Sequence, residues 1–160
     1  MGGELTVSVG IDHGQFIACD PAAELDIDSY DDLAQRAGLA VWGNASGLTV
    51  FTASHWTRST VTVRLTLARP TVPEREWDHL VEAGLVLRSG RLNLYGPEDT
   101  NVNESSVVVS PGTYSVIVSG KNFDTTNQYG DEGTDTYALH LWPGPLLERR
   151  VLKDGFTWMD

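Results

Sequence analysis

Hydrophobic and polar residues alternate with a two-residue period through most of the chain, and this pattern is typical of half-buried β-strands. The clearest case lies within residues 107–142. Tyr114, Val116 and Val118 alternate there with the residues between them, and residues 135–142 resume the same period. A polar, Gly-rich link over residues 120–134 separates the two runs. The pattern predicts two strands that present a loop between them.

The same alternation recurs along the rest of the chain and predicts further short strands. They cover residues 5–9, 15–19, 48–53, 61–67, 77–88 and 91–95. We expect the strand at 48–53 to pair with that at 61–67, and Ser89-Gly90 to turn the strand at 77–88 into a hairpin with 91–95. Many short strands with frequent turn signals favour a mainly β protein, an antiparallel β-sandwich.

One segment departs from the strand pattern and predicts a short helix over about residues 29–37. Ser29 stands three positions before Asp32, which is a weakened form of the capping box. Acidic residues suit the positive end of a helix, and Gly38 is a typical stop. We expect this to be the single helix of the fold.

The length of 160 residues and a hydrophobic fraction of 41% fit one globular domain with a single core. We expect the β-sandwich domain to span residues 1–145. Pro143-Gly144-Pro145 would close the sheet, and residues 146–160 would form a C-terminal tail with Trp158 exposed or docked.

The formal net charge of −11 changes the expected set of partners. It disfavours nucleic acid and anionic membranes as direct partners and favours encounter with a basic protein, although many soluble proteins are acidic without any such role. The chain has no apolar run near the length of a membrane span, and its first residues lack the basic and apolar regions expected of a secretion signal. Cys19 is the single cysteine, so a reducing compartment, the cytoplasm, is expected.

Candidate chemistry is sparse, and we expect neither an enzyme nor a cofactor or metal site. Cys19 lies in a predicted strand, where a dyad with His13 would require a bulge. The four histidines are dispersed and form no metal-binding pair. Residues 124–135 superficially resemble a calcium loop, but the twelfth position holds Asp135 instead of glutamate.

The link between the two clearest strands is the best candidate for a binding site. It combines acidic residues, which steer a basic partner, with aromatic side chains that anchor it. The candidate partner-binding residues are Phe123, Asp124, Tyr129, Asp131, Glu132 and Asp135. The same composition also fits a solvated loop that binds nothing.

Two other functions stay open. A module that binds a small ligand or carbohydrate would use Trp42, Trp56 or Trp77 as a stacking platform, although the alternation favours a core position for Trp77. A hydrolase built on the acidic loops would lack a nucleophile or base in a recognisable context. The partner's identity and the oligomeric state do not follow from the residues.

Several segments, in order along the chain, resemble competence protein J, the small bacterial inhibitor of a DNA-entry nuclease. These segments are residues 5–9 with Gln15-Phe16, residues 30–34 leading to Gly38, residues 47–51, residues 61–67, Pro111-Gly112-Thr113-Tyr114 and Asp135-Thr136-Tyr137. The resemblance implies an inhibitor or immunity-type protein that binds and blocks a nuclease or other toxin-like enzyme and has no catalysis of its own. The chain departs from that family in the link at 120–134 and in the segment after Pro143.

Overall fold

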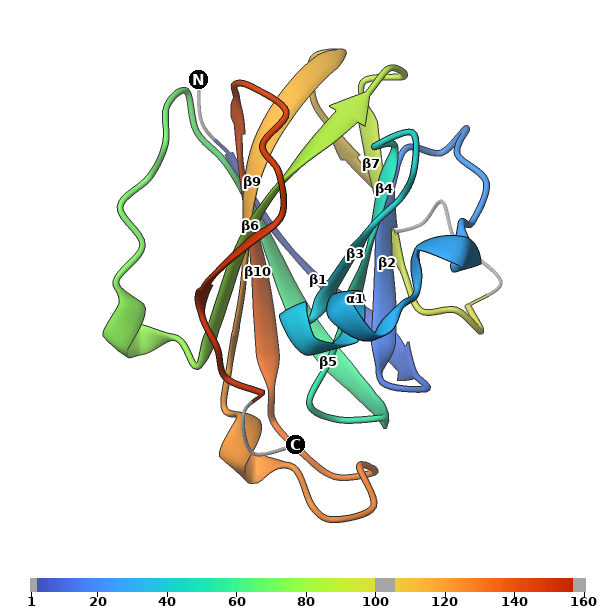
Figure 1. Cartoon of the computed structure of the whole chain (residues 1–160), viewed down its shortest axis with the longest axis vertical. Helices are drawn as coiled ribbons and strands as arrows, with labels where there is room; N and C mark the ends of the chain where they lie inside the picture. Colours follow the sequence, from blue (N-terminus) through green and yellow to red (C-terminus); the bar gives the residue numbers. More distant parts are fainter. Residues whose placement is uncertain (1–2, 100–105, 157–160) are drawn as a thin grey trace.

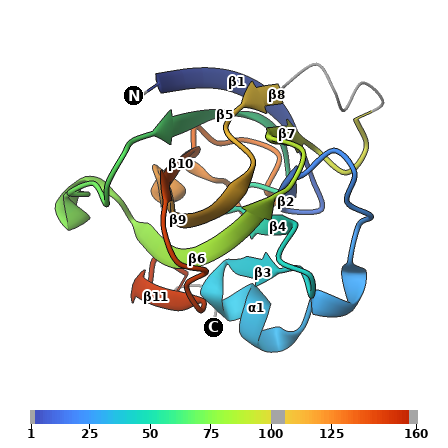
Figure 2. The same cartoon turned by 90° about the horizontal axis from the view of Figure 1, so that it is seen from above.

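The computed structural model describes residues 3–99 and 106–156 and has one mixed β-sheet that curls into a half-barrel (Figures 1 and 2). The strands are β1 (Gly3–Asp12), β2 (Gln15–Cys19), β3 (Leu39–Val41), β4 (Gly47–Phe51), β5 (Trp56–Leu65), β6 (His79–Leu87), β7 (Arg91–Tyr95), β8 (Ser106–Val108), β9 (Gly112–Lys121), β10 (Thr136–Pro143) and β11 (Arg150–Lys153). The helical segments are α1 (Asp32–Ala37) and three short 3-10 turns, η1 (Ile27–Ser29), η2 (Glu74–Glu76) and η3 (Phe123–Thr125).

The order of the strands explains how the sheet curls. It runs β11-β6-β9-β10-β5-β1-β2-β4-β3, with β7 paired to β2 and β8 paired to β7. β1 and β2 are in register at Asp12 and Gln15, next to their turn. His13 and Gly14 both have positive φ, 56° and 70°, as a tight hairpin turn with the right twist requires. Beyond that turn β2 pairs with β4 and β7, so the sheet continues as a second wall opposite the first.

The predicted β character and short helix are confirmed, but the antiparallel sandwich is wrong in its details. β5 and β10 run parallel, with Tyr137 opposite Val61 and Leu141 opposite Leu65. β4 pairs with β2 and β3 instead of β5, and β7 pairs with β2 and β8 instead of β6. Alternation in the sequence determines which side chains of a strand share a face. It does not show which strand lies next to it in the sheet, or whether the two run parallel or antiparallel.

Helix α1 ends where the sequence predicts, at Gly38, but it begins at Asp32 and not near Ser29. The Asp31 carboxylate accepts a hydrogen bond from Ala34 N at 2.8 Å, and Gly38 ends the helix in the left-handed conformation with φ 73°. The cap is therefore Asp31 and not Ser29, whose hydroxyl donates to the Asp26 carbonyl at 2.7 Å. Buried Ala34 and Ala37 face the protein, and α1 packs beside β3.

The central strands are covered on both faces. In β10, Tyr137, Leu139 and Leu141 join the main core inside the half-barrel, whereas Ala138 and Trp142 belong to a second apolar cluster on the outer face. The second cluster also contains Trp77, Leu80 and Ile117, with Val72, Leu147 and Leu152 packed against it. The connection between β5 and β6 and the segment around β11 therefore supply an outer layer that covers the sheet.

The residues after Pro145 are attached to the sheet. β11 pairs antiparallel with β6, with Val151 opposite Val81, and Phe156 is 7% exposed and packs on Phe123. The expected tail thus contributes a strand as far as the structure describes it, and Trp158 lies outside the described residues. Strand β11 was not predicted because its four residues are too few to show a clear alternation of apolar and polar side chains.

His79 ties three elements together. Its Nδ1 accepts a hydrogen bond from Gly155 N at 3.0 Å, so the proton resides on Nε2, which donates to the Ala37 carbonyl at 2.6 Å. Burial lowers the pKa of His79, although the Ala37 carbonyl and the Asp154 carboxylate at 3.9 Å act in the opposite direction. The neutral imidazole therefore joins β6 to the end of α1 and to the C-terminal segment.

Leu139→Ala should destabilise the protein strongly. Leu139 is 0% exposed in the strand that joins β9 to β5, and removal of such a side chain costs about 2–5 kcal/mol of unfolding free energy. Leu67→Ala is the matched control, because Leu67 is 70% exposed and a surface change of this kind stays within about 0.5 kcal/mol. Urea denaturation of both variants measures the difference, and equal effects would contradict the two-sided burial of β10.

Stability should fall as the pH falls from 7.5 to 5.5. The unfolded chain takes up a proton on His79 near its ordinary pKa of about 6.5, whereas the folded protein resists protonation because burial lowers that pKa. The neutral His79 side chain therefore makes its full contribution to the free energy of unfolding above about pH 6.5. That contribution is lost as the pH falls toward the pKa of His79 in the folded protein. Burial also lowers the pKa of His140, with help from Arg64, so its effect has the same sign.

The variant His79→Gln shows how much of the pH dependence of stability is due to His79. The unfolding free energy of the variant, measured in urea at pH 7.5, 6.5 and 5.5, should show a shallower pH dependence than that of the wild-type protein. The same slope in both proteins would show that His79 protonation does not govern the loss.

Candidate functional site

Three loops meet at one end of the half-barrel, the lower end in Figure 1. Gly14 N, in the β1–β2 turn, donates to the His55 carbonyl at 3.2 Å, and Thr52 N donates to the Gly14 carbonyl at 2.8 Å. The link between β9 and β10 joins them through the Gly130 carbonyl, which accepts hydrogen bonds from His55 N at 2.7 Å and Trp56 N at 2.9 Å. We call this junction the loop end.

The tip of the β9–β10 link is built around the side chain of Asn127. Its Oδ1 accepts hydrogen bonds from Asp131 N at 3.1 Å and Glu132 N at 3.3 Å, and its Nδ2 donates to the Asp131 carboxylate at 2.6 Å. The Asn127 carbonyl also accepts from Gly130 N at 3.1 Å. These bonds give residues 127–132 a defined turn that fixes the backbone of two acidic residues.

The base of the link is held by a buried carboxylate. Asp135 is 2% exposed, and its Oδ2 accepts hydrogen bonds from Ser54 N at 3.2 Å, Ser54 Oγ at 2.9 Å and Tyr137 Oη at 2.5 Å. Tyr137 Oη in turn accepts from Ala53 N at 2.8 Å. Burial, together with the Asp135 carboxylate, raises the pKa of Tyr137 well above its ordinary value, so the phenol keeps its proton and donates it to Asp135.

Two of the six predicted partner-binding residues are therefore buried, and their expected exposure is corrected here. Phe123 is 5% exposed and packs against Tyr137 and Phe156, with ring centroids 6.0 and 4.9 Å apart. Asp135 is the internal anchor just described. The polar and acidic composition of the β9–β10 link does not predict that Phe123 fills the core. Nor does it predict that the Asp135 carboxylate accepts hydrogen bonds from buried donors.

The other four predicted residues are exposed, and three of them are close in sequence to Gly130, whose carbonyl contacts the backbone of a tryptophan. Tyr129 is 70% exposed on the turn that ends with Asp131 and Glu132. Trp56, whose backbone N–H donates to the Gly130 carbonyl next to that turn, is 49% exposed, and its ring lies 4.5 Å from the His13 ring in an edge-on contact. The loop-end surface comprises His13, His55, Trp56, Tyr129, Asp131 and Glu132.

Asp124 lies apart from this surface. It lines a hollow of about 640 Å³ together with Lys121, Lys153 and Thr126. The Lys121 ammonium lies over the Trp77 ring, 5.0 Å from its centroid, and the Lys153 ammonium donates to the Trp77 carbonyl at 2.7 Å. Across residues 3–99 and 106–156, no basic side chain lies within 4 Å of Asp124 or of the Asp131 and Glu132 carboxylates.

The alternative sites predicted from the sequence are less well supported by geometry. Trp42 and Trp77 are 1% and 8% exposed, so of the three proposed stacking residues only Trp56 reaches solvent. Cys19 is buried against Tyr95, with Sγ 3.7 Å from the hydroxyl, and burial raises the pKa of the thiol. His13 lies at the opposite end of β2, about 20 Å away at the usual rise per residue, so a Cys19–His13 dyad is wrong.

Within residues 3–99 and 106–156, no group of three or more His, Cys, Asp or Glu side chains is placed to hold a metal ion. No helix within those ranges has the length and apolar character needed to cross a membrane.

Trp56 belongs to the loop end, although the sequence does not place it with the predicted partner-binding residues. The sequence predicts it only as a stacking residue, whereas in the structure its backbone N–H donates to the Gly130 carbonyl, next to Tyr129. A signal was present, because a large aromatic residue beside His55 in a turn between two strands is more exposed than one inside a strand. The contact across more than seventy residues could not be inferred from that signal.

Comparison with solved structures identifies the architecture. The crystal structure of ComJ from Bacillus subtilis, described as the inhibitor of the DNA degrading activity of NucA, superposes with a TM-score of 0.71 at 13% identity, over 90% of this chain and 99% of the other. This chain has a ComJ-like fold. A protein described as crocagin biosynthetic gene J shares the ComJ-like fold, with a TM-score of 0.64 at 18% identity over 91% of this chain and 99% of its own.

The resemblance to competence protein J that the sequence suggested is therefore confirmed at the level of the fold. No protein-family model and no curated protein sequence matches this chain. At 13% identity, the shared feature is the path of the backbone, and the residues of the loop end have to be judged by their own geometry.

Gly130→Ala should loosen the loop end. Gly130 has φ +72°, and a Cβ atom there would lie 2.9 Å from the His55 Cβ, so the turn would have to move off β5. We expect a loss of about 1–3 kcal/mol in unfolding free energy and faster amide hydrogen exchange at His55 and Trp56. Gly3→Ala is the control, because a Cβ at Gly3 meets nothing within 4 Å. Unchanged exchange in Gly130→Ala would contradict the role of this contact.

Proposed function

We propose that this protein is a non-enzymatic, cytoplasmic inhibitor that binds a basic partner protein, a nuclease or a toxin-like enzyme, through its loop-end surface. The observation that carries the proposal is the ComJ-like fold, which extends over 90% of the chain and nearly all of an inhibitor of a nuclease. The exposed residues at one end of that fold supply the chemistry for such a contact.

The charge of the loop-end surface suits a basic partner. Asp131 and Glu132 are exposed, their backbone is fixed by Asn127, and they have no cation within 4 Å in the described residues. The net charge of −11 adds a long-range field of the same sign. Such a field accelerates encounter with a positively charged surface, and the effect weakens as salt screens it.

Exposed aromatic residues supply the contact area. Tyr129 and Trp56 are 70% and 49% exposed, and each is held by the backbone bonds around Gly130. Tyr and Trp are enriched among the residues that dominate binding energy at protein interfaces. Because the turn is already ordered by Asn127, little conformational entropy is lost when a partner binds.

A binding role without catalysis fits the chemistry of the site. Cys19, the single cysteine, is buried with a raised pKa and lies far from His13. Of the loop-end histidines, His13 contacts the Trp56 ring, and the backbone of His55 forms hydrogen bonds with Gly14 and Gly130. An inhibitor of this kind acts by occupying the surface of its target, so it needs shape and charge complementarity instead of a nucleophile.

The double variant Asp131→Lys with Glu132→Lys should weaken partner binding by at least tenfold. The protein encoded beside this gene is the first candidate partner, and binding is measured by surface plasmon resonance with its enzymatic activity followed in parallel. The association rate of the wild-type complex should fall as salt rises from 50 to 300 mM, and the variant should lose most of that dependence. Tyr129→Ala should mainly accelerate dissociation.

A charge-matched control separates the site from the overall field. Glu24→Lys with Asp28→Lys changes the net charge equally, but these exposed residues lie near η1 and α1. The control should slow association slightly and leave the dissociation rate unchanged. If both double variants behave alike, the loop end is not the contact surface. If the wild-type protein binds the candidate but leaves its activity intact, inhibition is excluded for that partner.

A further inference from the structure

The outer face of the sheet carries a second hollow, away from the loop end. It lies over β6 and β9, between the connection from β5 to β6 and strand β11, and has a volume of about 450 Å³. Charged and apolar side chains line it, among them Arg69, Val72, Glu74, Leu80, Ile117 and Arg150. Leu80 and Ile117 lie at the base of the hollow but are only 2% and 3% exposed, so the apolar surface is supplied by the half-buried side chains of Val72 and Leu152. A hollow of this size is usual for small-molecule sites.

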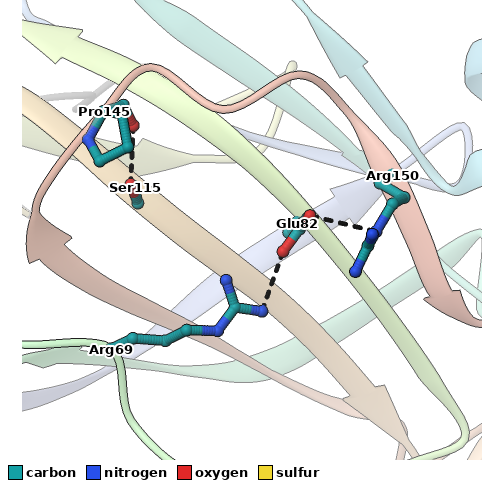
Figure 3. Close-up of polar contacts among 5 residues, drawn as sticks. All are labelled: Arg69, Glu82, Ser115, Pro145 and Arg150. Atoms are coloured by element: carbon teal, nitrogen blue, oxygen red, sulfur yellow. Dashed lines mark hydrogen bonds and ion pairs between the residues drawn. The ribbon is translucent and has the colours of Figure 1, made fainter.

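One carboxylate, that of Glu82, contacts two guanidinium groups that line this hollow, and Figure 3 shows the two contacts. Glu82 on β6 is 8% exposed, and its Oε2 lies 2.9 Å from Arg69 Nη2 while its Oε1 lies 3.2 Å from Arg150 Nε. Arg69 also lies over the Trp142 ring, 5.5 Å from the centroid. The two arginines come from opposite walls and are therefore fixed relative to each other.

The segment that leads into β11 and carries Arg150 is held by a second polar contact, which Figure 3 also shows. The Ser115 hydroxyl donates to the Pro145 carbonyl at 2.7 Å, which holds the segment before β11 against β9. Gly84 permits this approach, because a Cβ there would lie 2.5 Å from Leu146 Cδ1 and 2.8 Å from Leu147 N. The hollow is thus bounded by ordered backbone on the β11 side.

The arginine pair retains most of its capacity to donate hydrogen bonds. A guanidinium has five N–H donors in a planar fork, and the Glu82 contacts engage one nitrogen of each group. The Arg69 and Arg150 side chains are 48% and 70% exposed, so these donors are accessible. A planar oxyanion is the group that such a fork recognises best, and fixing the fork in advance lowers the entropy lost on binding.

We propose that this hollow binds a small amphipathic carboxylate. Its head group meets the unused donors of Arg69 and Arg150, and its short aliphatic body packs against Val72 and Leu152. Glu82 acts as a positioning residue, because it orients both arginines without reaching the lining of the hollow. Glu74, which also lines the hollow, carries the like charge and weakens the affinity. The site is independent of the loop-end surface and of any partner bound there.

Sodium octanoate is the probe, measured by isothermal titration calorimetry below its micellar concentration at about 0.15 M salt, where the field of the acidic chain is largely screened. We expect a saturable isotherm with one site. Octan-1-ol, which lacks the charge, and octylammonium, which reverses it, should bind at least tenfold more weakly. An isotherm that does not saturate, or octanol that binds as well as octanoate, would overturn the proposal.

Arg150→Gln is the decisive variant, since Arg69 still pairs with Glu82 and leaves no buried carboxylate alone. It should lower the octanoate affinity at least tenfold, whereas Glu74→Gln should raise it. Arg91→Gln, at an exposed position on β7, is the matched control and should change nothing. Far-ultraviolet circular dichroism verifies that each variant is folded. Full octanoate affinity in folded Arg150→Gln would refute the assignment.

Discussion

The parallel pairing of β10 with β5 is the contact on which the rest of this structure depends. It joins residues 61–65 to residues 137–141 and connects the N-terminal strands to the group formed by β6, β9 and β11. Without it, the two halves of the sheet would expose their edges and the core between them would open to water. Because strands so distant in sequence must meet in register, this pairing carries a large cost in chain entropy, which the burial of β10 on both faces offsets.

The same strand explains why the loop end is ordered. Tyr137 begins the register with β5, and its hydroxyl meets both Asp135 and the backbone of Ala53. The junction of the three loops is therefore a continuation of the sheet, and its outward residues inherit their positions from the core. This arrangement lets a few exposed side chains act as a preformed surface, which is the property that a protein inhibitor requires.

Local structure could be predicted from the sequence to a greater extent than its assembly. The strand at 112–121, the strand at 136–143 and the end of the helix at Gly38 follow from alternation and helix-end chemistry. The parallel pair, the partner of β7 and the docking of β11 depend on contacts between distant segments, which no local pattern encodes. At the loop end, acidic character and Tyr129 were predictable, whereas the burial of Phe123 and Asp135 depends on neighbours that only the folded chain supplies.

The sequence contains two lysines, Lys121 and Lys153, and both line the hollow beside Asp124. Reagents that attack side-chain amines, whether crosslinkers, acylating dyes or activated sensor surfaces, will therefore modify this protein at one small region next to η3. The modified side chains would adjoin the link that begins at Asn122. Coupling through an introduced thiol on the opposite wall would keep that region free, since the natural cysteine is enclosed in the core.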